Sequence, residues 1–285
     1  MSDDRQMTTI VLDRVTTIFG PDPNRIWPLL AEGRTKSEIL TRTAHHVALN
    51  NVSLTVAPGE ILAVMGISGS GKSTLLRTFN FLAPPTRGSV LIDGKPLDAA
   101  DASGLRAVRR ATFGMVFQHF GLLPHLSVAD NVAFPLTLAG LDAPTRRARA
   151  EMWLARVGLG AESRSFPHQL SSGMQQRVGL ARALINDPPV LLMDEPFAAL
   201  DPLTRRDMQD EVLRLQSELK KTVIIITPDP ADALRLADRV AVLRDGALVQ
   251  SGSYRDITRN PADEGVAAFV RGFGPARAPV TALGA

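Results

Sequence analysis

The sequence lacks cysteine altogether, and it lacks any apolar run long enough to cross a membrane. With no cysteine among 285 residues, disulfide bonds, thiolate zinc sites and cysteine nucleophiles are excluded. No stretch approaches the roughly 18 consecutive apolar residues of a membrane span. The polar, acidic start MSDDRQMTTI also lacks the basic and then apolar profile of a secretory signal. These absences favour a soluble, cytoplasmic protein.

Clustered positive charge is missing as well. The net charge is +3, from 32 Lys and Arg against 29 Asp and Glu, and only 5% of the residues are aromatic. The basic residues are scattered, without a long basic block or interleaved aromatics, so nucleic acid is not an expected partner. Neither an internal repeat nor a sustained heptad pattern is present. The length allows one large domain, or one core with a subsidiary lobe.

The apolar pattern of the first hundred residues predicts strands around a helical insert. Residues 8–19 alternate apolar and polar side chains, as an edge strand does. In the polar insert that follows, Thr35 and Glu38 have capping-box spacing, which predicts a short helix before a second strand near 47–56. The continuous apolar run at 60–66 is typical of a strand covered on both faces.

The remainder predicts an α/β fold with a mostly parallel sheet. Asp-Gly pairs at 93–94 and 245–246 indicate hairpins, and the pattern between about 100 and 175 is mostly helical. Strands at 189–193 and 222–227 then alternate with helices at 173–185, 202–220 and 230–237, as in a parallel sheet. We therefore expect one domain over 1–272, with a core at about 8–99 and 176–272, an antiparallel edge portion, an inserted helical lobe at about 100–175, and a flexible tail at 273–285.

A phosphate-binding motif, G-x-x-x-x-G-K-[ST], lies between the buried strand and a predicted helix. Glycines let several backbone N–H groups point at phosphate oxygens, and the helix N-terminus adds partial positive charge. Lys72 is expected to reach the β- and γ-phosphates, Ser73 to ligate Mg²⁺, and Thr74 to lie near the α-phosphate. The alternative is a glycine-rich turn with a solvated lysine. The residues expected to bind ATP here are Gly66, Ser68, Gly69, Ser70, Gly71, Lys72, Ser73 and Thr74.

Two carboxylates, Asp194 and Glu195, end the apolar strand VLLMDE. Ligands bind at the carboxyl edge of such sheets, which places both acids beside the phosphate loop. Asp194 is expected to hold Mg²⁺, directly or through water, and Glu195 to accept a proton from the attacking water. Capping of the next helix is a weaker explanation, because Pro196 and Phe197 intervene.

Together with this loop, the segment LSSGMQQRVGLARALINDPPVLLMDEPFAALD at 170–201 resembles the ATP-binding cassette (ABC) family, whose fold is that of the RecA-like P-loop NTPases. Its signature motif, Walker B strand and D-loop follow in the family's order and spacing. The resemblance implies that Ser171 and Gly173 contact the ATP of a second cassette, so that two copies enclose two ATP molecules. Asp201 would line the partner's site, although Asp-Pro is also a good helix start and both roles are compatible.

Two further residues take roles from the resemblance. Gln118, in GMVFQHF, matches the Q-loop, which senses Mg²⁺ and the attacking water and links the site to the helical lobe. Phe19 lies where the family carries an aromatic platform for adenine, with a core phenylalanine as the alternative. The expected catalytic residues are thus Glu195, Lys72 and Gln118, and the expected metal ligands Ser73, Gln118 and Asp194.

Two positions depart from the family pattern. Ser172 replaces the first glycine of Leu-Ser-Gly-Gly and adds a side chain where the backbone packs closely. Pro228 stands where the family places a histidine that hydrogen-bonds the γ-phosphate. Proline offers neither a side-chain donor nor an amide N–H, so it cannot substitute chemically, and slower turnover is expected.

The insert at 18–40 is similar to that of ATP-binding subunits of importers for glycine betaine, proline and choline. This resemblance implies ATP hydrolysis coupled to uptake of a quaternary ammonium osmoprotectant. The implied partners are a second cassette, in a homodimer, membrane permease subunits that hold the protein at the inner face of the membrane, and indirectly a substrate-binding protein. Two alternatives stay open: a weakly hydrolysing cassette paired with a competent one, and a soluble ABC ATPase outside transport.

Overall fold

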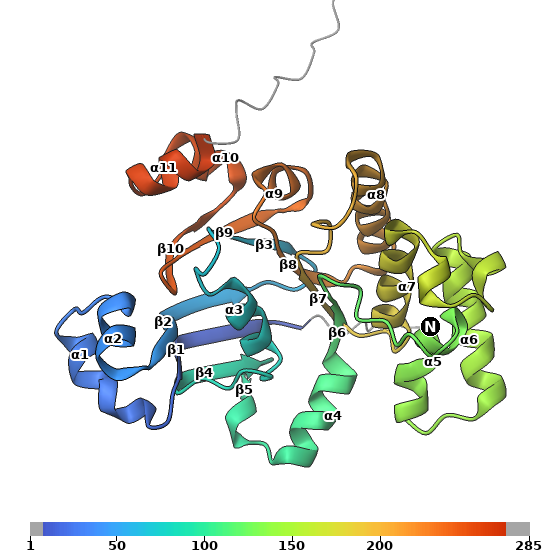
Figure 1. The fold of residues 1–285 in the computed structure, drawn as a ribbon, viewed down its shortest axis with the longest axis horizontal. Coiled ribbons are helices and arrows are strands. Elements are labelled where there is room, and N and C mark those ends of the chain that lie inside the picture. The colour runs from blue at the N-terminus through green and yellow to red at the C-terminus, as the bar shows by residue number, and fades with distance from the viewer. Residues whose placement is uncertain (1–7, 272–285) are drawn as a thin grey trace, which may run out of the picture.

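Two β-sheets and the helices around them make up the protein (Figure 1). The structure, a computed structural model, describes residues 8–271; the tail predicted at 273–285 lies outside the described residues. One sheet has four antiparallel strands in the order β2-β1-β4-β5, and the other has six in the order β10-β9-β3-β8-β7-β6. The strands are β1 Ile10–Phe19, β2 His46–Val56, β3 Ile61–Met65, β4 Arg87–Ile92, β5 Lys95–Pro96, β6 Phe113–Val116, β7 Val190–Asp194, β8 Thr222–Ile226, β9 Arg239–Arg244 and β10 Ala247–Gly252.

Helices follow most of the strands, as the alternating pattern predicts. Those of the insert, α1 and α2, lie at the opposite end of the molecule from α5, α6 and α7 in Figure 1. The α-helices are α1 Trp27–Ala31, α2 Lys36–Thr43, α3 Lys72–Phe79, α4 Ala102–Thr112, α5 Val128–Leu138, α6 Ala143–Arg156, α7 Ser172–Leu184, α8 Pro202–Leu219, α9 Pro230–Leu236, α10 Tyr254–Arg259 and α11 Glu264–Arg271.

The six-stranded sheet is buried on both faces. All five residues of β3 and all five of β8 are buried. In β3, Ala63 and Met65 pack toward α5 to α8, whereas Leu62 and Val64 pack toward the antiparallel sheet and α3, because successive side chains of a strand point to opposite faces. Each large apolar side chain buried in this way contributes about 1.5–3 kcal/mol to folding. The predicted α/β fold with a mostly parallel sheet is confirmed.

Three sequence-based expectations need correction or refinement. The strand at 8–19 is no edge strand: β1 lies between β2 and β4, paired antiparallel with both. The region at 100–175 is not wholly helical, because β6 adds a parallel edge strand beside β7. The antiparallel portion is a sheet of its own rather than only an edge, and β10 adds one antiparallel strand to the larger sheet.

The insert between β1 and β2 folds around a small core of its own. Ile18, Ile26, Ile39 and Val47 form this cluster. Helix α2 starts as predicted, with the Thr35 hydroxyl accepting from the Glu38 N–H and the Glu38 carboxylate accepting from the Thr35 N–H. None of the helices that the structure describes is long and apolar enough to cross a membrane.

Candidate nucleotide site

Four neighbouring parallel strands bring the candidate residues to one edge of the sheet. In space the strands run β3, β8, β7, β6, although β6 precedes β7 and β8 in the chain. Their carboxyl ends lead into Gly66, Thr227, Asp194 and Gln118, respectively. Ligands of α/β sheets bind at this edge. The sheet order therefore places position 228 between the phosphate loop and the two carboxylates.

The loop at 66–71 has the conformation of a phosphate cradle. Gly66, Gly69 and Gly71 have φ values of 151°, 77° and 104°. Residues other than glycine rarely adopt such values. A β-carbon on Gly66 would lie 2.2 Å from the Leu243 carbonyl oxygen. Among the described residues, no side chain caps the start of α3, and the buried hydroxyl of Ser70 has no hydrogen-bond partner. An anion at this helix N-terminus would meet these free donors.

The ammonium group of Lys72 lies over the same loop. Its Nζ donates to the carbonyl oxygens of Gly66 and Ile67, at 2.9 and 3.0 Å. Burial lowers the pKa of this side chain, and the nearby carboxylates of Glu195 and Asp194 partly oppose that effect. Both of these hydrogen bonds go from Lys72 to backbone oxygens, and a phosphate group would give the ammonium an anionic partner.

A hydroxyl and a carboxylate meet beside the lysine. Ser73 Oγ donates to Asp194 Oδ1 at 3.2 Å, although 121 residues separate the two in the chain. Magnesium prefers oxygen ligands and usually keeps several waters, so two converging protein oxygens suit it. No cluster of three or more acidic or histidine side chains that could form an all-protein metal site occurs among residues 8–271. This donor set fits a magnesium ion shared with phosphate oxygens.

Glu195 is held in an unusual backbone conformation next to Gln118. Its φ of 44° lies in the left-handed region, which costs on the order of 1 kcal/mol for a side-chain-bearing residue and is common at functional sites. The Glu195 N–H donates to the Ile226 carbonyl of β8 at 3.1 Å. Gln118 Nε2 donates to the Glu195 carboxylate at 3.1 Å. The backbone of Glu195 is therefore held by β8, and its carboxylate by Gln118 in the turn after β6.

Ser171, Gly173 and Asp201 lie apart from the phosphate loop. Ser171 caps α7, where its hydroxyl accepts from the Met174 N–H at 3.3 Å. Asp201 caps α8 by accepting from the Leu203 and Thr204 N–H groups. Hydrogen bonding with the Thr204 side chain, and then these N–H bonds, lower the pKa of Asp201. Within the described chain no hydrogen bond links these three residues to residues 66–74. Ser172 is the half-buried first residue of α7.

Phe19 is not a core residue. Its side chain is 49% exposed at the end of β1, where it stacks beside His46, with ring centroids 6.4 Å apart. His46 is the neighbour of Phe19 in the sheet register. The two rings form an exposed flat surface of the kind that a nucleotide base can cover.

A buried polar network next to Pro228 is not evident from the sequence. Asp232 is 2% exposed and accepts hydrogen bonds from Arg205, Gln209 and Thr227. Arg205 also pairs with Asp229 at 2.7 Å. Thr227 in turn accepts from the Asp229 N–H. These contacts hold the loop that contains Pro228 against the start of α8. In the sequence, the only signal for this polar network is the spacing of the acidic residues after position 228.

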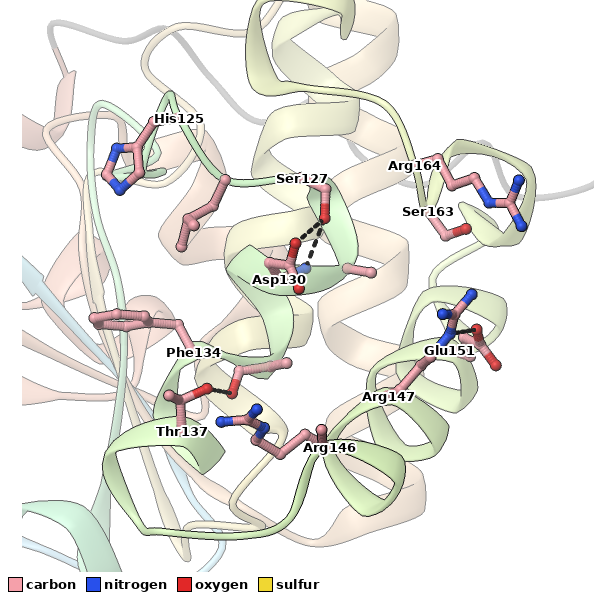
Figure 2. Close-up of a pocket in the computed structure, with 14 residues that line it drawn as sticks. His125, Ser127, Asp130, Phe134, Thr137, Arg146, Arg147, Glu151, Ser163 and Arg164 are labelled. Atoms are coloured by element: carbon pink, nitrogen blue, oxygen red, sulfur yellow. Dashed lines mark hydrogen bonds and ion pairs between the residues drawn. The ribbon is translucent and has the colours of Figure 1, made fainter.

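A separate pocket of about 720 Å³ lies away from the phosphate loop, between α5, α6 and the loop after α6. Figure 2 shows Phe134 and Thr137 on one wall and Arg146 and Arg147 on the other. An ion pair of 2.9 Å holds Arg147 to Glu151. Apolar side chains and three arginines, Arg146, Arg147 and Arg164, line the pocket together.

A family model described as ABC transporter matches residues 49–198, the stretch that holds the phosphate loop, Gln118 and both carboxylates. The chain belongs to this family. It is 47% identical over 93% of its length to the glycine betaine/carnitine transport ATP-binding protein GbuA of Listeria monocytogenes, of which it spans 66%, just under two thirds. It is 49% identical over 92% of its length to the trimethylamine N-oxide transport system ATP-binding protein TmoW of Ruegeria pomeroyi, of which it spans 77%.

The fold agrees with solved cassettes. A dimeric structure of the ATP-binding cassette MJ0796 in a post-hydrolysis state, bound to ADP and Pi, has a TM-score of 0.72 and 34% identity, over 86% of this chain and 99% of that one. Membership of the ABC family, which the motifs predict, is thus shown, and the P-loop NTPase fold is confirmed.

Proposed function

We propose that the protein is the ATP-binding subunit of an importer and couples ATP hydrolysis to uptake of a quaternary ammonium or N-oxide osmolyte. One observation carries the hydrolytic part: the Ser73–Asp194 and Gln118–Glu195 pairs lie at the same edge of the sheet as the phosphate loop. The similarity to GbuA and TmoW, which are ATP-binding proteins of glycine betaine/carnitine and trimethylamine N-oxide transport systems, supports the transport part.

The proposed roles follow from the positions of the side chains. Backbone N–H groups of residues 66–74 and the ammonium of Lys72 bind the phosphates of ATP. Ser73 and Asp194, with Gln118 beside them, hold Mg²⁺, which neutralises developing negative charge when bound. Glu195 accepts the proton of the attacking water. Gln118 keeps the carboxylate of Glu195 in place, and Phe19 stacks on adenine.

A second copy of the chain completes the proposed site. Ser171 caps a helix whose start makes no hydrogen bond with residues 66–74 within the described chain, and such a helix start favours a phosphate supplied by another copy. Asp201 would lie near the same partner. The dimeric assembly of MJ0796 supports a homodimer with two ATP molecules at the interface.

Permease subunits are the proposed membrane partners. The pocket between α5 and α6 is lined by apolar side chains and by arginines, and would accept a short helix that presents apolar and acidic residues. These contacts would hold the protein at the inner face of the membrane. A substrate-binding protein and the permease would then select the solute.

Steady-state ATP hydrolysis by the assembly tests this proposal. We expect Mg²⁺-dependent turnover that Glu195→Gln lowers by about 10²-fold or more, because the general base is lost, while ATP still binds. Glu264→Gln, at an exposed carboxylate on α11, is the matched control and should leave turnover unchanged. Absence of ATP binding, or copurification with nucleic acid in place of membrane subunits, would overturn the proposal.

Pro228 favours a second candidate function. In the sheet order, position 228 lies between the phosphate loop and the carboxylates, yet proline has no donor to offer there. The chain could therefore bind ATP, hydrolyse it slowly and work beside a second, competent cassette. Copurification with a different cassette protein, together with slow turnover of this chain alone, would favour this candidate over the homodimer.

A further inference from the structure

Helix α2 of the insert reaches the back of the phosphate loop through one side chain. Lys36, the first residue of α2, extends its Nζ to within 3.3 Å of the Ala48 carbonyl oxygen on β2. The capping box of Thr35 and Glu38 fixes the start of this helix and so fixes the position from which the lysine extends.

The Ala48 carbonyl is a meeting point of three segments. A β-carbon on Gly71 of the phosphate loop would lie 2.5 Å from this oxygen. A β-carbon on Gly246, in the turn between β9 and β10, would lie 2.6 Å from the same oxygen and 2.9 Å from Lys36 Nζ. Phosphate loop, hairpin turn and insert are therefore in direct contact at one backbone oxygen.

The turn between β9 and β10 also contacts the phosphate loop. The Gly246 N–H donates to the Ser70 carbonyl oxygen of the phosphate loop at 2.9 Å, and the Asn50 N–H donates to the Gly246 carbonyl at 2.8 Å. Ser70 is the residue whose buried hydroxyl has no partner in the described chain. The lysine thus lies one contact away from Ser70 and Gly71, the last two residues of the loop.

The lysine is kept in this place at an energetic cost. Burial lowers the pKa of Lys36, and the carboxylate of Asp245 partly opposes this effect. A lysine free to reach water would avoid this desolvation by extending outward. Its inward position is therefore maintained by its contacts with the Ala48 carbonyl and the 245–246 turn.

We propose that Lys36 is a positioning residue for the phosphate-binding loop, through which the insert sets the affinity of the site for ATP. The side chain lies behind Gly71 and acts through Ala48 and Gly246, without touching the nucleotide. Any molecule that displaces α2 would weaken ATP binding by the same route. This inference rests on the proposed binding of ATP at residues 66–74.

The experiment compares Lys36→Met with Arg42→Met, which removes an exposed charge from the same helix. Loss of the hydrogen bond from Lys36 to the Ala48 carbonyl, against which Gly71 packs, should raise the Kd and the KM for ATP about fivefold to tenfold, with kcat nearly unchanged. Arg42→Met should match the wild type. Lys36→Arg, which keeps a charged donor, should restore part of the affinity. Fluorescence titration with a labelled ATP analogue and urea unfolding are measured on each protein.

Two outcomes would contradict the inference. If Lys36→Met lowers the urea midpoint but leaves the Kd for ATP unchanged, the lysine serves only folding. If the Kd of both methionine variants equals that of the wild type, the contact has no role in binding. Should Lys36→Met fail to fold, Lys36→Gln, a polar but uncharged side chain too short to reach the Ala48 carbonyl, replaces it and must show the same rise in Kd. Absence of ATP binding by the wild type would instead reject the proposed function itself.

Discussion

Gly173 faces the γ-methyl group of Thr204 so closely that a β-carbon on Gly173 would lie 2.3 Å from it. Gly173 is the second residue of the signature helix α7, and Thr204 is in the first turn of α8, which Asp201 caps. The second glycine of the signature is therefore required within a single copy of the chain, by the packing of α7 on α8. Its proposed contact with a partner's ATP is a separate requirement.

Replacement of Gly173 separates these two requirements. Gly173→Ala forces a clash with the Thr204 methyl group and should lower the free energy of unfolding by about 1–3 kcal/mol. The second change Thr204→Ser removes that methyl group and should restore most of the stability, as urea unfolding would show. Gly160→Ala, at a site with no atom closer than 4.0 Å to the new carbon, is the control. If the stable double variant still hydrolyses ATP slowly, Gly173 also acts across the dimer.

Gln118→Ala should slow hydrolysis without weakening the fold. The amide of Gln118 holds the Glu195 carboxylate at 3.1 Å, and a hydrogen bond to a charged group contributes about 1.5–3 kcal/mol. If this bond aims the base, kcat falls about tenfold to 100-fold. The urea midpoint should stay at the wild-type value. A fall in both quantities together would show that the glutamine acts on stability instead.

Pro228→His should accelerate ATP turnover. A histidine there would supply the donor that proline lacks, and one preorganised donor at a transition state is worth about 10²- to 10³-fold in kcat. Pro84→His, at another exposed proline, controls for the added imidazole. Equal rates for the wild type and Pro228→His would mean that a hydrogen-bond donor at position 228 does not raise kcat in this protein.

Arg205→Leu should destabilise the protein more than Arg206→Leu, its exposed neighbour. The change leaves the buried carboxylate of Asp232 without its cationic partner, and breaking a buried ion pair costs about 3–5 kcal/mol. Urea unfolding measures both variants. Similar midpoints would show that Gln209 and Thr227 satisfy Asp232 unaided.

The stability contribution of Lys72 should depend on pH. Burial lowers its pKa in the folded state, so between the folded pKa and the unfolded pKa the unfolded chain binds more protons, and stability rises with pH. Below the folded pKa both states are protonated and the difference is constant. The wild type should therefore gain stability relative to Lys72→Met as the pH rises from 7 to 10. Lys95→Met, at an exposed lysine, should show no such change.

Local signals predicted the parts of the site that are continuous in sequence. The phosphate loop needs a buried strand before it and a helix after it, and both are present at β3 and α3. The capping box at Thr35 and Glu38 likewise depends only on neighbours in the chain. Asp194 and Glu195 could be placed beside the loop because all carboxyl ends of a parallel sheet meet at one edge.

Features that depend on distant partners were missed or wrong. The alternation in β1 cannot show that β4, far along the chain, covers its second edge. Strand β6 has four residues, too few for a periodic pattern. The hydrogen bonds from Arg205 to Asp232 join α8 to α9. A local sequence pattern cannot predict them, because it does not show how two helices lie relative to each other. These errors share one cause, which is that sheet order and side-chain pairing are set by the tertiary fold.

Strand β3, which leads into the phosphate loop, pairs only with β8 and β9 among the described strands. Both neighbours come from the last quarter of the chain. During synthesis, β3 therefore remains unpaired until these two strands have been made. At ribosomal rates of 5–20 residues per second this interval lasts about 10–30 s. An apolar strand left open for that time favours aggregation, so we expect the nascent protein to depend on chaperones. A fragment that ends before Thr222 should be unable to form the nucleotide site at all.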